Sequence, residues 1–142
     1  MIKEYRNFPI SCKALVVEKN KKKNTYFSDI KKIYFKELKK NELLIKVNYS
    51  SLNFKDMMVV NGNPGLVRNY PHVPGIDAAG IVIKSFNKKF KNGDKVVIIG
   101  KPLGISINGG FSEIIKIPIN WVEKIPKNIS LKKSMIFGTA GF

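Results

Sequence analysis

The sequence PHVPGIDAAG, residues 71–80, and the sequence SSLNFKD, residues 50–56, decide the fold of this chain. Both stretches lie beside β-rich apolar runs, and both are dense in proline, glycine and small polar residues. Residues of these types shape the backbone of a cleft more readily than they serve a plain surface loop. The chain ends in GTAGF, residues 138–142, where we expect a second domain to begin and to supply the other wall of the cleft.

Short apolar runs on both sides of these stretches predict a mainly β fold with short helices. The predicted strands are 12–18, 25–33, 43–49, 76–86, 95–99, 111–117 and 121–125. The first two form a hairpin, and a glycine within 76–86 indicates a bulge or a close backbone approach. Helices are expected at 54–60, ending at Asn61-Gly62, and from Leu131, with Ser130 as its cap. Strands at a spacing of about ten residues predict a small, partly open β-barrel.

The composition is that of one folded domain. The chain has 142 residues, of which 44% are hydrophobic, and this is sufficient for a buried core. No stretch approaches the roughly 20 apolar residues that a membrane-spanning helix needs. Residues 1–11 lack the apolar centre of a secretory signal. We therefore expect a cytoplasmic enzyme with no membrane partner.

Cys12 and His72 are the only cysteine and the only histidine. One cysteine excludes an intrachain disulfide and a cysteine-rich zinc site. Cys12 begins a core strand, so we expect a buried, inert thiol. We expect His72 to be a packed loop side chain and not a base.

The formal charge of +16 is compatible with a nucleic-acid-binding function, because basic surfaces bind phosphates. The positive charge is nearly all lysine, spread along the chain, with Arg6 and Arg68 as the only arginines. Arginine is the residue suited to bidentate recognition of bases and phosphates. The pattern favours solvated lysine faces, and a basic nucleic-acid-binding β-barrel is retained as the alternative from another class. The charge would also attract anionic substrates and cofactors.

An ordered series of motifs resembles the medium-chain dehydrogenase/reductase superfamily, in its zinc-independent, quinone-oxidoreductase-like branch that includes acryloyl-CoA reductases. The matching stretches are 49–53, 55–56, 67–71, 74–77, 91–96, 109–111 and 138–142. The resemblance implies a GroES-like catalytic barrel at 12–130, an N-terminal extension at 1–11, and at 131–142 the start of a helix leading to a Rossmann domain that binds NADPH. That domain is absent from this sequence, which has no Gly-x-Gly-x-x-Gly.

The resemblance also implies the reaction, which is NADPH-dependent reduction of an activated carbon–carbon double bond, as in an acryloyl-CoA-like enoyl thioester. The alternative substrate within the superfamily is a quinone or an alkenal. Zinc-using relatives place a cysteine at Asn53 and a Gly-His-Glu at 75–77, whereas this chain has Gly-Ile-Asp there. We therefore expect no zinc. We also expect this chain alone to be inactive and the full-length form to be a homodimer.

By the same resemblance, Asn53 faces the nicotinamide ribose or the substrate, and the structural alternative is that Asn53 caps the turn. Phe54 lies against the cofactor, at a position that is usually tyrosine in acryloyl-CoA reductases. Thr139 touches the nicotinamide amide, and Gly141 permits close backbone approach. Lys55, or an ordered water, is the candidate general acid.

Several of these residues have a structural alternative. Lys55 and Asp56 are catalytic candidates, or they form a local ion pair that sets the helix. Asp77 is either a partly buried structural carboxylate that holds the Asn53 loop, which we favour, or a site residue. Arg68 with Tyr70 either reaches an anionic tail of the substrate, such as a coenzyme A phosphate, or belongs to a solvated loop. The whole interpretation requires Asn53, Asp77 and Thr139 to face one side of the molecule.

Overall fold

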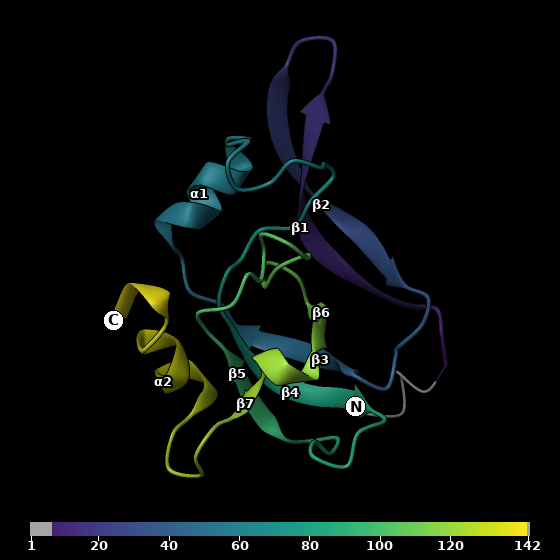
Figure 1. Cartoon of the computed structure of the whole chain (residues 1–142), viewed down its shortest axis with the longest axis vertical. Helices are drawn as coiled ribbons and strands as arrows, with labels where there is room; N and C mark the ends of the chain where they lie inside the picture. Colours follow the sequence, from purple (N-terminus) through teal and green to yellow (C-terminus); the bar gives the residue numbers. More distant parts are fainter. Residues whose placement is uncertain (1–6, 142) are drawn as a thin grey trace.

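The computed structural model describes residues 7–141 as two antiparallel sheets with short helices at one side (Figure 1). The first sheet contains β1 (Ile10–Asn20) and β2 (Thr25–Phe35). The second has five strands in the order β6-β3-β4-β5-β7. Its strands are β3 (Glu42–Tyr49), β4 (Ala78–Ser85), β5 (Lys95–Ile98), β6 (Ile114–Pro118) and β7 (Glu123–Lys124). The prediction of a mainly β fold with short helices is confirmed.

Strands β1 and β2 form a long hairpin whose tip projects from the body of the molecule (Figure 1). The pairing runs from Ile10 opposite Phe35 to Asn20 opposite Thr25, so the predicted hairpin is confirmed. The strand begins at Ile10, which is buried, two residues before the predicted start. Most of the expected N-terminal extension, residues 1–6, lies outside the described residues.

The main core lies within the five-stranded sheet. Alternation along the strands turns large aliphatic side chains inward, and the cluster is closed by Phe90 and Val122. Its other buried members are Leu43, Ile45, Ala78, Val82, Val96, Ile98, Leu103, Ile115 and Ile117. The pairing of β3 with β4 is irregular between Val47, which faces Gly80, and Tyr49, and this confirms the bulge expected beside that glycine.

The stretch around Gly75 packs backbone against backbone on a second glycine-rich loop. Gly110 N donates to Gly75 O at 2.8 Å, and Phe111 N donates to Pro74 O at 3.0 Å. Gly75 has φ 108°, and a Cβ there would lie 2.5 Å from Phe111 N. Only glycine satisfies both conditions. Because these residues pair as loops, β4 and β6 begin at Ala78 and Ile114, later than predicted.

The two α-helices are short and begin and end close to where the sequence predicts. Helix α1 (Phe54–Val60) is followed by its C-cap Asn61 and by Gly62, whose φ is 74°. Helix α2 (Leu131–Ile136) is capped by Ser130, whose Oγ accepts from Lys133 N at 3.1 Å. The predicted strand 121–125 is shorter than expected, because a 3₁₀ turn (Ile119–Trp121) precedes β7. Among residues 7–141, no helix has the length and apolar character needed to cross a membrane.

Candidate functional site

Asp77 is the centre of a hydrogen-bonded hub that joins three distant parts of the chain. Its side chain is fully buried. Oδ2 accepts from Ser51 Oγ at 2.8 Å, from Asn53 Nδ2 at 3.2 Å and from Thr139 N at 2.7 Å. Oδ1 accepts from Thr139 Oγ1 at 2.7 Å. The expectation that Asp77 holds the Asn53 loop is confirmed, and Asn53, Asp77 and Thr139 meet at one place.

Gly138 makes this hub possible. A Cβ at this position would lie 2.8 Å from Asp77 Oδ2 and 2.8 Å from Ser51 Oγ, closer than real Cβ contacts. Thr139 begins the 3₁₀ turn Thr139–Gly141, which follows α2 in the chain. The Asp77 carboxylate therefore holds this turn next to the start of β4. This part of the terminal segment is therefore held by a buried group. Phe142 lies outside the described residues.

Asp56 forms a second buried carboxylate clamp next to the first. Its exposed fraction is 3%, and Oδ1 accepts from both Gly75 N and Ile76 N at 3.0 Å. Oδ2 accepts from Asn53 N at 2.9 Å as part of a capping box. Burial raises the pKa of the Asp56 carboxyl above its ordinary value, while these backbone donors act in the opposite direction. Asp56 therefore positions the start of α1 against the Gly75 loop.

Asn53 lies between the two clamps, and its neighbours on α1 face outward. Phe54 is 71% exposed, and Lys55 is exposed. Within residues 7–141, Lys55 forms no ion pair with Asp56, so that structural alternative for the two residues is wrong. Lys55 extends into solvent beside Asn53. Its role as a general acid, like that of Asp56 as a catalytic group, stays a prediction.

An apolar groove of about 750 Å³ runs between α2 and the β5–β7 edge of the sheet and reaches Thr139. Its lining is mostly aliphatic and aromatic. The lining residues are Val97, Ile99, Gly100, Lys101, Trp121, Glu123, Ile125, Pro126, Ile129, Ser134, Phe137 and Thr139. Leu52, at 82% exposed, and Phe54 present further apolar side chains on either side of Asn53 in the sequence. The hub is thus a polar point at the border of an exposed apolar surface. Gly141, in the turn after Thr139, is exposed there.

The structure places Arg68 and Tyr70 away from this hub, at the other end of α1. The Tyr70 hydroxyl donates to Val59 O at 2.9 Å, and its ring lies 4.9 Å from that of Tyr26 on β2. Burial, with the neighbouring Tyr26, raises the pKa of Tyr70. Tyr70 is therefore a packing residue, whereas Arg68 is exposed.

His72 and Cys12 take structural positions, as expected. His72 Nε2 lies 2.9 Å from Gly104 O, and burial lowers the pKa of its imidazole. Cys12 Sγ donates to Ile114 O at 3.7 Å, and burial raises the pKa of the thiol. A raised thiol pKa makes the nucleophilic thiolate scarce.

Sequence reasoning missed Ser51 as a member of the hub and Trp121 and Phe137 as walls of the groove. The only signal for Ser51 was its place in the Ser-Ser pair before Asn53. Ser50 Oγ donates to Asp77 O at 2.6 Å, so both serines bind the same residue. No local pattern could reveal this, because 26 positions separate Ser51 from Asp77.

Comparison with known proteins gives a family match over most of the described fold. Residues 39–127 match the family described as alcohol dehydrogenase GroES-like domain. The match includes Asn53, Asp56 and Asp77 and ends before α2 and Thr139.

Curated relatives extend the similarity beyond residues 39–127. The chain is 42% identical over 129 residues to the putative quinone oxidoreductase YhfP of Bacillus subtilis, covering 91% of this chain and 38% of that protein. It is 38% identical over 129 residues to the acrylyl-CoA reductase AcuI of Ruegeria pomeroyi, covering 91% of this chain and 39% of that protein. The chain therefore spans about two fifths of the length of these relatives.

The similarity to solved structures covers the same share of each chain. The structure of Bacillus subtilis yhfP with NAD bound superposes with a TM-score of 0.83 at 40% identity, covering 93% of this chain and 40% of that chain. Escherichia coli YhdH with bound NADPH gives a TM-score of 0.81 at 31% identity, covering 90% of this chain and 39% of that one. Both of these similar proteins hold a nicotinamide dinucleotide.

Proposed function

Since this chain belongs to the alcohol dehydrogenase GroES-like domain family of the medium-chain dehydrogenase/reductases, we propose that it is the substrate-side part of an NADPH-dependent reductase. The proposed substrate is an alkene activated by a thioester, of the acryloyl-CoA type. The single observation that carries the proposal is the Asp77 hub, which fixes Asn53 and Thr139 together beside an exposed apolar groove.

The hub supplies the orientation that reduction of an activated double bond requires. A thioester carbonyl already delocalises the charge that arrives with a hydride, so the protein's part is to position the alkene and to place donors near the developing enolate oxygen. Asp77 holds the Asn53 amide and the Thr139 backbone in fixed positions. The apolar surface around Leu52, Phe54 and Phe137 would exclude water from the alkene.

A reduced nicotinamide supplies the hydride in this chemistry when it is bound. The residues of this chain fit one end of such a cofactor. Phe54 presents an exposed ring, and Thr139–Gly141 presents a backbone turn in which Gly141 has no side chain. The nucleotide end would be held by the part of the relatives that this chain does not span. We accordingly propose that the chain alone binds NADPH weakly.

The side chains that could bind zinc favour a reaction without it. The Asp77 carboxylate already accepts four hydrogen bonds, and Asn53 offers an amide, which is a poor zinc ligand. Cys12 and His72 are occupied by Ile114 O and Gly104 O, away from the hub. Reduction of a conjugated alkene needs no Lewis acid of this kind, because the thioester carries the charge. Lys55 or a water molecule would deliver the proton.

A quinone is the second candidate substrate. One relative at 42% identity is named putative quinone oxidoreductase, and the groove beside Thr139 is largely apolar, as a quinone ring would require. The expectation of a homodimer for the full-length protein stays a prediction.

The test is turnover by a protein that joins this chain to a complete nicotinamide-binding domain. We expect oxidation of NADPH with acryloyl-CoA to exceed that with a benzoquinone, and to continue undiminished after treatment with a zinc chelator. Asn53→Ala should lower kcat, and Lys88→Ala, in the β4–β5 loop, should not. Equal or faster turnover of the quinone would assign the second substrate, and loss of activity on chelation would contradict the zinc-free reaction.

A further inference from the structure

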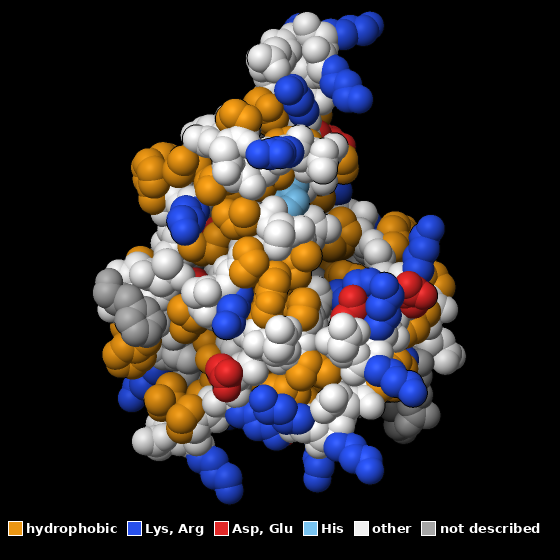
Figure 2. All heavy atoms as spheres, viewed as in Figure 1, with side chains coloured by type: hydrophobic (Ala, Val, Ile, Leu, Met, Phe, Trp, Pro, Cys, Tyr) orange, Lys and Arg blue, Asp and Glu red, His pale blue; other side chains and the backbone are white. Residues whose placement is uncertain are grey.

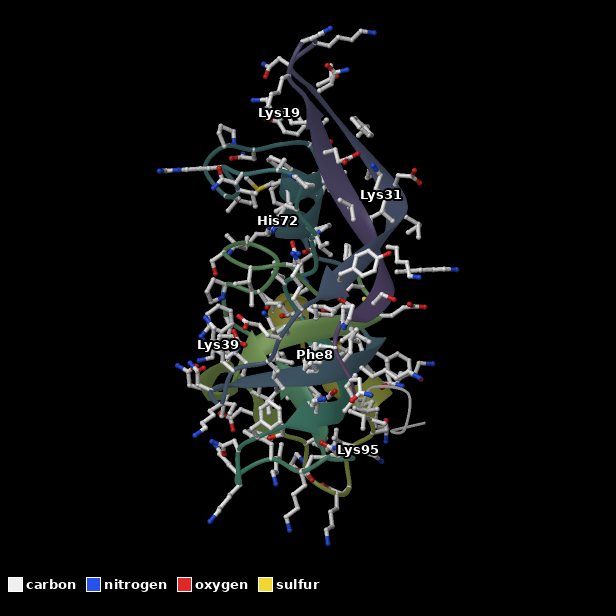
Figure 3. All side chains as sticks on the ribbon, turned by 90° about the vertical axis from the view of Figure 1, so that its right-hand side faces the viewer. Phe8, Lys19, Lys31, Lys39, His72 and Lys95 are labelled. Atoms are coloured by element: carbon white, nitrogen blue, oxygen red, sulfur yellow. The ribbon has the colours of Figure 1, made fainter. Side chains whose placement is uncertain are left out.

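A basic notch lies between the tip of the β1–β2 hairpin and the loop that follows α1. It has a volume of about 370 Å³. The residues that line it are Lys19, Lys21, Asn24, Arg68, Asn69 and Tyr70. Three of these are cations, two are amides, and none is a carboxylate. Lysine and arginine side chains gather at this projecting end of the molecule (Figure 2), where Lys19 lies along the hairpin above His72 (Figure 3).

The floor of the basic notch is rigid. Tyr26 on the hairpin and Tyr70 on the loop meet edge to face, with ring centroids 4.9 Å apart. The Tyr70 hydroxyl donates to Val59 O, and a Cβ on Gly62 would lie 2.1 Å from the Tyr26 ring. The hairpin and the loop are therefore packed against the last turn of α1. Groups presented from a preformed surface lose less entropy when they bind a ligand.

The cations of the basic notch lack anionic partners. On the same hairpin, Lys31 forms an ion pair with Glu18. By contrast, Lys19, Lys21 and Arg68 form no ion pair within residues 7–141. Like charges gathered in this way repel each other, and an anion between them removes the repulsion. An arginine fork with nearby ammonium groups is suited to a phosphate.

We propose that the basic notch binds the phosphate groups at the nucleotide end of a coenzyme A thioester. This inference rests on the proposed reductase function, and it selects the thioester over the quinone. Helix α1 connects Asn53 to the notch, and its seven residues span roughly 10 Å. A substrate that reacts at Asn53 and is held at Arg68 must therefore carry its phosphates on an extended arm. A thioester on the pantetheine arm of coenzyme A meets this requirement, and a quinone has no such group.

The experiment is a calorimetric titration of the chain with adenosine 3′,5′-bisphosphate, which represents the nucleotide end without the acyl group. We expect Arg68→Ala to weaken binding about tenfold, because a charge-assisted pair of hydrogen bonds is lost. Lys21→Ala should weaken it about threefold, as expected for a more solvated cation. Lys88→Ala removes the same charge from the β4–β5 loop and should change binding by less than about twofold.

Three binding results would overturn the proposal. The first is an equal effect of Arg68→Ala and Lys88→Ala, which would show a general charge effect. The second is equal affinity for inorganic phosphate and for the bisphosphate. The third is tighter binding of a random duplex DNA that depends on Arg68, which would assign the notch to nucleic acid. None of these readouts needs reduction to occur. In the joined enzyme, an unchanged KM for the thioester in Arg68→Ala would reject the notch and leave the reductase intact.

Discussion

The two ends of α1 hold charge in opposite ways. At its start, Asp56 and Asp77 are buried, and every carboxylate oxygen accepts at least one hydrogen bond. At its end, the basic notch presents exposed cations that form no ion pair among the described residues. Both ends are polar, and in the sequence they look equally suited to bind a ligand.

The difference teaches which charges shape a site and which remain free to bind. Burying a carboxylate costs several kcal/mol unless its oxygens are satisfied, so the charges at the start of α1 are committed to the fold. Exposed lysines and arginines cost little and keep their donors free. Substitutions at the start of α1 should therefore change stability, and substitutions in the basic notch should change ligand binding alone.

The largest effect should come from Asp77→Ala. Removing this carboxylate leaves the donors of Ser51, Asn53 and Thr139 without their shared acceptor, so we expect the free energy of unfolding to fall by about 3 kcal/mol. Urea unfolding measures the change. Asp29→Ala, at an exposed position on β2, is the control and should change it by less than about 0.5 kcal/mol. Equal losses of stability for both variants would contradict the claim that the buried Asp77 carboxylate stabilises the fold more than an exposed charge does.

Gly138→Ala should lower the free energy of unfolding by about 2 kcal/mol, because the new methyl group would displace Ser51 or Asp77. Gly65→Ala is the matched control, because the nearest atom there is Asn63 Oδ1 at 3.1 Å. Thermal unfolding of both variants provides the comparison. A Gly138→Ala variant as stable as Gly65→Ala would mean that the hub tolerates displacement.

The free energy of unfolding should fall on acidification through the pH range in which the single histidine takes up a proton. Burial lowers the pKa of His72, so the unfolded chain takes up a proton near pH 6.5 while the folded chain resists it. This contribution to stability is present above pH 6.5 and is lost as the pH falls below that value. Urea unfolding at pH near 7.5 and near 5.5 measures it. His72→Gln should flatten the difference, and an unchanged pH dependence in that variant would contradict the assignment.

The smallest effect on stability should come from the basic notch. Arg68→Ala and Lys21→Ala remove charges that repel each other, so each should leave the free energy of unfolding within about 0.5 kcal/mol of the original value. Chemical unfolding at low and high salt checks this. A loss near that of Asp77→Ala would show that these cations are part of the fold.

The sequence predicts the local parts of this arrangement well. The β1–β2 hairpin follows from two short apolar runs and the turn between them, and helix α1 is predicted at 54–60 with its end at Asn61-Gly62. It also indicates Asp77 as a carboxylate that holds the Asn53 loop. The partners that complete the hub are less visible, because Thr139 lies 62 positions from Asp77. Only packing brings them together.

The basic notch, at the other end of α1, could also be predicted from the sequence only in part. Arg68 and Tyr70 lie within the matching stretch 67–71 and could be proposed from the sequence as a site for an anionic tail. Lys19 and Lys21 could not be joined to them, since their proximity depends on the docking of Tyr26 against Tyr70 and Gly62. The structure also changes the role of Tyr70, whose hydroxyl is bonded to Val59 O.

The most direct test of the central claim is a double-mutant cycle between Asn53→Ala and Thr139→Ala, measured by urea unfolding. Because both residues donate to the Asp77 carboxylate, we predict a coupling free energy of at least about 0.5 kcal/mol between them. The parallel cycle between Asn53→Ala and Arg68→Ala should be additive within about 0.5 kcal/mol. Additive effects of Asn53→Ala and Thr139→Ala would contradict the claim that one buried carboxylate unites the two sides of the site.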